Sequence, residues 1–123
     1  MVTKVRAAVA SDESPRERIL EAARTLLLAK GHRRLSLREV ARRAGYSPAS
    51  LYEHFDGKDA IVGALAAEAG SALYAALAKA AAGQREPKDR LVRIGRAYVR
   101  FARQHPQDFL LLFSHLPSSR RSL

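Results

Sequence analysis

The sequence predicts an all-α protein in which a three-helix helix-turn-helix unit is followed by a partial second unit of helices. Two observations predict this class. Hydrophobic residues make up 47% of the 123 residues while aromatic residues make up only 7%, and an alanine-rich composition favours helices over strands. In addition, Ser14, Ser36 and Ser47 each stand directly before an amphipathic segment, where serine is a preferred N-cap.

The first helix is expected to begin after Ser14, with Pro15 in the first helical position and Glu17 completing a capping box. Its apolar stripe consists of Ile19, Ala22, Ala23 and Leu26. Gly31 is expected to end it in the left-handed conformation that a helix terminus favours.

The next two helices follow the same pattern. Ser36 caps a two-turn helix, Glu39 is expected to close a second capping box, and Leu35 can pack on Val40 across the cap. After Ala44–Gly45, Ser47 and Pro48 open a third helix, where Tyr46 can pack on Leu51 in the same way. Two short helices joined by a tight glycine turn predict a helix-turn-helix.

Three further helices are expected. A long one begins at Asp56 or Gly57, either of which could cap it, and runs to about Ala82. After a loop from Ala82 to Pro87, a helix over 88–105 carries Leu91, Ile94, Tyr98 and Phe101 on one side, and Arg93, Arg96, Arg100 and Arg103 on the other. Pro106 starts a last short helix. The predicted organisation is a flexible arm over 1–13, the helix-turn-helix over 14–56, helices over 57–116 and a disordered tail over 117–123.

Composition limits the compartment and the partners. The chain has no cysteine, no apolar run of membrane-spanning length and no signal-peptide core in its first ten residues, so we expect a cytoplasmic protein. The net charge is +10, which favours a polyanionic partner such as nucleic acid. Between Lys30 and Arg43 there are six basic residues and a single acidic one, Glu39.

The basic segment leads directly into the candidate DNA-binding residues. In a helix-turn-helix the early residues of the second helix face base edges in the major groove; here these are Ser47, Pro48, Ala49 and Ser50. Phosphate contacts, which fix register, are expected from Tyr52, His54 and Lys58 on one side and from Ser36 and Arg38 on the other. Tyr46, in the turn, completes this candidate set.

No catalytic residue, cofactor site or metal site is predicted. The four histidines match no metal-ligand spacing, and Gly57-Lys58 is followed by Asp59 rather than by the serine or threonine of a P-loop. An enzyme is therefore the least supported class. The alternatives that stay open are packing roles for Tyr52 and His54, a solvated or lipid-facing arginine stripe, and a helical interaction or membrane-surface module without specific DNA readout.

Residues 16–65 resemble the DNA-binding domain of TetR-family transcriptional regulators. The serine before the second helix, "VARRAGYS", "SLYEHF" and Gly57-Lys58 match that family in order and spacing. The resemblance implies a bacterial or archaeal regulator that usually represses transcription as a dimer on a palindromic operator, with a small-molecule effector acting through the C-terminal helices. It also implies that Tyr52, His54 and Lys58 contact phosphates and that Ser47 to Ser50 read bases.

Regulators of this family are usually much longer, and their dimer helices lie beyond the part matched here. We therefore expect either a truncated regulator or a minimal one that assembles differently. In both cases the apolar run Phe109–Phe113 is expected to expose a surface prone to self-association.

Overall fold

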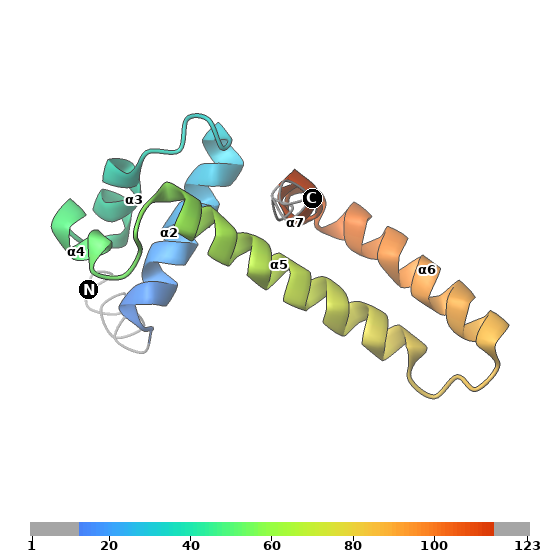
Figure 1. Cartoon of the computed structure of the whole chain (residues 1–123). Coiled ribbons are helices and arrows are strands. Elements are labelled where there is room, and N and C mark those ends of the chain that lie inside the picture. Colours follow the sequence, from blue (N-terminus) through green and yellow to red (C-terminus); the bar gives the residue numbers. More distant parts are fainter. Residues whose placement is uncertain (1–12, 115–123) are drawn as a thin grey trace, which may run out of the picture. The chain divides into compact units, whose positions relative to one another are not determined.

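The computed structural model describes residues 13–114, and every regular element in that range is an α-helix (Figure 1). The helices are α2 (Pro15–Lys30), α3 (Leu37–Ala44), α4 (Pro48–Tyr52), α5 (Lys58–Ala81), α6 (Pro87–Gln104) and α7 (Pro106–Ser114). The predicted all-α class is confirmed. Except for Glu13, the predicted arm and tail lie outside the described residues. The chain divides into two compact units between Ala64 and Leu65, within α5, whereas the sequence placed the change of domain at residue 57.

Helix α2 begins with the predicted capping box. The Glu17 N–H donates to Ser14 Oγ over 3.1 Å, and the Ser14 N–H donates to Glu17 Oε1 over 3.0 Å. The backbone hydrogen bond from Ser14, together with its hydroxyl, holds the pKa of Glu17 below its ordinary value of 4.5. At the other end Gly31 has φ 85° and ψ 168°, so its φ is positive as expected, but its ψ lies outside the left-handed helical region.

The cap of α3 differs from its prediction in one bond. The Glu39 N–H donates to Ser36 Oγ over 3.4 Å, as expected. The Glu39 carboxylate does not complete a capping box; it forms an ion pair with Lys30 Nζ in the last turn of α2. The carboxylate that the sequence assigned to the cap is thus engaged by a residue of the preceding helix, and the second capping box was wrongly predicted.

Helix α4 has only five residues and is capped by Ser47, whose Oγ accepts from the Ser50 N–H over 3.1 Å. The carbonyl of Gly57 accepts from the Ile61 N–H, which puts Gly57 rather than Asp56 at the N-cap position of α5. Four helices contribute fully buried side chains to the core of this unit: Ile19, Ala23, Val40, Ala41, Leu51 and Ile61. Burial of each large apolar side chain stabilises the unit by roughly 1.5–3 kcal/mol.

In the second unit α6 runs antiparallel to α5 after the 82–86 loop (Figure 1). The Arg93 Nε–H donates to the Ala80 carbonyl over 3.0 Å, and Ala97 and Phe101 are buried. Leu91, expected on this apolar face, is instead 71% exposed. At about 100° per residue it lies roughly 120° around α6 from Ala97, so it stands outside the packed face.

Helix α7 packs through its aromatic residues. The ring of Phe109 lies edge-on to Tyr98 with centroids 5.5 Å apart, and at 4.8 Å from Phe113. Leu110 and Phe113 are 64% and 43% exposed. Part of the expected apolar surface over Phe109–Phe113 is therefore present.

By length and composition alone, α5 would be long and apolar enough to cross a membrane. Core helices of water-soluble proteins meet the same criterion. Its first turns carry Ile61 and Val62, which are buried within the helix-turn-helix unit. Glu68 interrupts the apolar sequence on the exposed side of α5.

Two glycine-to-alanine changes should have opposite effects on stability. Gly45 ends α3 with φ 88°, and a Cβ there would lie 3.3 Å from Arg18 Nη2. Gly95 lies inside α6, and a Cβ there would meet no atom within 4 Å. We expect Gly45→Ala to lower the free energy of unfolding by about 1–2 kcal/mol and Gly95→Ala to raise it by about 0.5–1 kcal/mol. Urea unfolding followed by circular dichroism measures both, and a gain for Gly45→Ala would contradict the role of the left-handed turn.

Candidate nucleic-acid interface

The candidate interface consists of α3, the turn after it, α4 and the start of α5, all within the first compact unit (Figure 1). Arg38 and Arg42 are exposed on one face of α3, as their spacing of four residues requires. Together with Gly45, Tyr46 and Pro48 they line an open depression between α3 and α4. The structure thus brings three predicted residues together: Arg38 of α3, Tyr46 of the turn and Pro48 at the start of α4.

The start of α4 presents small side chains on a defined backbone. Pro48 and Ala49 are exposed and Ser50 is half-buried. Ser47 Oγ accepts from the Ser50 N–H and donates to Ser50 Oγ over 3.2 Å. Because Ser50 Oγ accepts this hydrogen bond, the Ser50 hydroxyl proton remains available for donation to a partner. Small side chains at this end also let the backbone come close to a flat or grooved partner.

From Leu51 in α4 to Phe55 after it, the chain divides its side chains between the core and the surface. Leu51 and Phe55 are buried, whereas Tyr52 is 54% exposed and His54 is exposed. A packing role for Tyr52 in the core is therefore excluded. The imidazole of His54 lies 6.4 Å from the Tyr46 ring, centroid to centroid, so these two predicted residues stand side by side.

Three predicted residues stand at helix starts. Ser36 is the half-buried cap of α3, Arg38 is exposed in its first turn, and Lys58 is the partly exposed first residue of α5. The N–H groups of a first helical turn have no partner within the helix, and the helix dipole favours anions there. The shared role of Ser36, Ala49, Tyr52 and Lys58 with the other candidates stays a prediction.

The sequence reasoning missed two arginines of α2 that hold the region around α4. The Arg18 guanidinium lies over the Tyr46 ring, 5.3 Å from its centroid, and that of Arg16 lies 4.9 Å from the centroid of Phe55. Cation–π contacts of this kind stabilise by about 0.5–1 kcal/mol at exposed sites. One arginine thus contacts the residue before the Ser47 cap, and the other contacts a residue after the end of α4. No local spacing predicts either contact, because each pair is separated by more than twenty residues.

Positive charge is concentrated on α3 and the loop before it, whereas the chain from α4 into α5 carries the exposed acidic residues Glu53, Asp56 and Asp59. Glu39, the single acidic residue of the basic segment, is paired with Lys30, which leaves the exposed side chains of Arg33, Arg34, Arg38, Arg42 and Arg43. Such a cluster attracts polyanions. Within residues 13–114 no group of three or more histidine, aspartate or glutamate side chains could hold a metal ion. The arrangement is suited to binding a polyanion through cations, hydroxyls and helix starts.

This combination of fold and surface defines a helix-turn-helix protein. Residues 19–70 match the model of the bacterial regulatory proteins of the tetR family. Residues 19–70 are therefore similar to the N-terminal domain of the tetR family, in agreement with the resemblance over residues 16–65.

Several solved structures are similar to this chain. The TetR family transcriptional regulator PfmR from Thermus thermophilus is 33% identical with a TM-score of 0.64, over 78% of this chain and 52% of that one. The superantigen PfiT is 23% identical with a TM-score of 0.72, over 90% and 57%. A TetR family transcription regulator from Marinobacter aquaeolei is 20% identical with a TM-score of 0.70, over 91% and 61%. The last two likenesses show the fold alone.

This chain therefore spans between half and two thirds of the length of these structures. No curated protein matches its sequence.

A double-mutant cycle tests the contact between Arg18 and Tyr46. Arg18→Met keeps most of the aliphatic stem and removes the charge, and Tyr46→Leu removes the aromatic face. We expect a coupling free energy of about 0.5–1 kcal/mol between the two changes in urea unfolding. Arg43→Met, on an exposed arginine of α3, is the matched control and should show no coupling with Tyr46→Leu. Equal effects in both cycles would mean that Arg18 acts only as a surface charge.

Proposed function

We propose that this chain is a transcriptional regulator that binds double-stranded DNA sequence-specifically through α4. The observation that carries the proposal is the exposed start of α4, where small side chains and a held serine pair lie beside the arginines of α3. The tetR-family domain over 19–70 supports the same function.

In this proposal α4 enters the major groove, which is about 12 Å wide and presents a distinct donor and acceptor pattern for each base pair. Ser50 donates its free proton to a base acceptor such as a guanine or adenine N7. The exposed Pro48 and Ala49 offer apolar contact to a thymine methyl group. Ser47 acts mainly as the cap that holds this geometry.

Phosphate contacts on either side fix the position of α4. Tyr52, His54 and Lys58 serve one strand, and Ser36 and Arg38 serve the other, with Arg42 added by its place in the α3–α4 depression. These contacts contribute affinity and salt dependence but no sequence preference.

The regulatory part of the proposal follows from the family. A homodimer would bind two half-sites about 34–36 Å apart on a palindromic operator. We propose that it acts in the cytoplasm as a repressor and that a small-molecule effector releases it. No cofactor and no enzymatic step is involved.

The experiment that tests the function is fluorescence anisotropy with DNA from upstream of the protein's own gene. A scrambled duplex of equal length and composition serves as the control, and both are measured at several salt concentrations. Tight binding to the upstream DNA alone, with a steep salt slope, is the expected result. Equal weak binding to both duplexes would exclude sequence-specific readout by this chain.

Replacing Lys58 should weaken binding to all duplexes by a similar factor. Because one phosphate contact is lost, we expect Lys58→Ala to flatten the slope of log affinity against log salt by about one unit. Lys88→Ala is a matched control, since Lys88 is likewise a lysine in the first turn of a helix, α6. An altered sequence preference with an unchanged slope would assign Lys58 to base readout instead.

Replacing Ser50 should change sequence preference more than overall affinity. Ser50→Ala removes the outward hydroxyl but keeps the backbone N–H that Ser47 accepts. We expect discrimination at one base pair to fall by about 1–3 kcal/mol, measured with a panel of single-base operator variants. Unchanged discrimination across the whole panel would remove Ser50 from the base-reading residues.

A further inference from the structure

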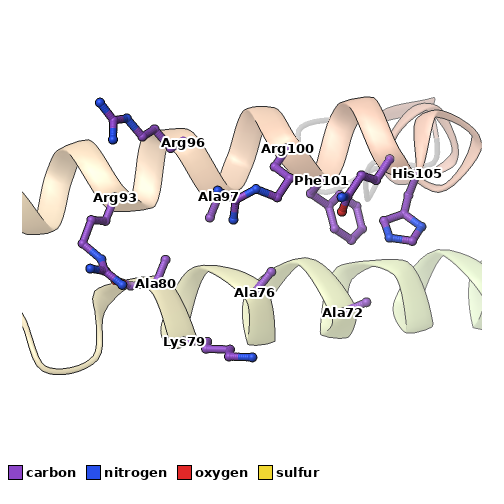
Figure 2. Close-up of a pocket in the computed structure, with 11 residues that line it drawn as sticks. Ala72, Ala76, Lys79, Ala80, Arg93, Arg96, Ala97, Arg100, Phe101 and His105 are labelled. Atoms are coloured by element: carbon purple, nitrogen blue, oxygen red, sulfur yellow. The ribbon is translucent and has the colours of Figure 1, made fainter.

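The second compact unit contains an open groove of about 630 Å³ between α5 and α6 (Figure 2). Its volume lies within the roughly 300–1,000 Å³ of typical small-molecule sites. All of its lining residues belong to this one unit. None of them belongs to the candidate nucleic-acid interface.

The α5 side of the groove is an apolar track. Ala72, Ala76 and Ala80 project toward α6 (Figure 2), and residues four apart lie one above another on a helix. At about 1.5 Å per residue this track is roughly 12 Å long. Phe101, which is buried, adds an aromatic surface from α6. The groove thus has an elongated apolar surface that alanine side chains are too short to fill.

Most of the other residues that line the groove are cationic. Lys79, Arg93, Arg96 and Arg100 line the groove, and no carboxylate is among the lining residues. Arg93 is anchored by its Nε–H to the Ala80 carbonyl over 3.0 Å. Its terminal guanidinium nitrogens are then left to meet a ligand. Figure 2 shows Arg100 lying between the two helices and Arg96 projecting away from α5.

An apolar track beside uncompensated arginines recognises one class of small molecule. A cation would be repelled, and a fully polar anion would leave the alanine track in contact with water. We propose that this groove binds an amphipathic carboxylate, with its linear apolar part along Ala72, Ala76 and Ala80 and its carboxylate between Arg93 and Arg100. Arginine suits this role because its planar fork pairs with carboxylate oxygens.

The regulatory consequence rests on the proposed function. Helix α5 is continuous from Lys58, a candidate phosphate contact, to the alanines of the groove. A ligand that favours one arrangement of α5 and α6 shifts DNA affinity by as much as its affinity differs between the two arrangements. We therefore identify the amphipathic carboxylate as the class of effector that releases this regulator from DNA.

Isothermal titration of the full chain with decanoate tests binding without any DNA. Decyltrimethylammonium has the same chain with the opposite charge, and decan-1-ol has it with no charge. Decanoate should bind more tightly than both, and its affinity should fall with added salt. Equal affinity for decanoate and decyltrimethylammonium, or no decanoate binding, would overturn the proposal.

Charge variants locate the carboxylate. We expect Arg100→Gln to weaken decanoate binding by about fivefold, a modest factor because the groove is open to water. Arg103→Gln is the matched control, since Arg103 is an exposed arginine of α6 that does not line the groove. The same loss of decanoate affinity in both variants would show that binding depends only on net charge. It would contradict a specific carboxylate site in the groove.

Filling the track tests the apolar part. Ala76→Leu places a larger side chain in the groove and should reduce decanoate affinity by at least about tenfold. Ala75→Leu, one residue along on the exposed side of α5, should leave it unchanged. Circular dichroism confirms that both variants stay helical, and the arginine pair decides the question should Ala76→Leu unfold the unit.

Adding decanoate to the chain bound to its upstream DNA separates the two proposals. Release of the DNA by wild type but not by Arg100→Gln is the expected result. Binding of decanoate without release would keep the site and remove its regulatory role. If the chain binds no DNA specifically, the proposed function is wrong. The titration with decanoate still tests the ligand groove in that case, because it uses no DNA.

Discussion

The candidate interface depends on how a helix of five residues is held in place. A helix of this length does not form by itself in water, because its few hydrogen bonds do not offset the cost of ordering the first turn. Helix α4 exists because Ser47 satisfies the Ser50 N–H, Leu51 is fully buried, and Arg16 and Arg18 of α2 lie over Phe55 and Tyr46. Its exposed residues, Pro48, Ala49 and Tyr52, are therefore not needed for packing and can face a partner.

In the second unit, too, the residues that pack the helices differ from those that are left to meet a ligand. Ala97 and Phe101 pack α6 toward α5, and Arg93 ties the two helices together near the loop. The alanines of α5 leave space beside this contact rather than filling it. Helix α5 carries Lys58 at its start and the alanine track near its end, so one continuous helix serves both the proposed DNA contact and the proposed ligand groove.

The predictions that succeeded concern interactions between residues close in sequence. The caps at Ser14, Ser36 and Ser47 and the inward positions of Leu51 and Phe55 follow from spacings of three or four residues. The predictions that were wrong concern which partner a side chain takes among residues of other helices. The Glu39 carboxylate pairs with Lys30, nine residues away, and Leu91 lies outside the face that α6 packs. The DNA contacts of the candidate residues remain predictions, because they require a partner.

By itself the sequence determined the helices, most of their caps and the helix-turn-helix, since each depends on local hydrogen bonding and on the periodicity of apolar residues. Only the tertiary structure decided that arginines of α2 hold the aromatic residues at both ends of α4 and that Arg42 joins Arg38 and Tyr46 in one depression. It also decided that the arginines of α6 border an alanine-lined groove. These features arise between side chains on different helices, and their proximity is set by how the helices pack and by no spacing along the chain.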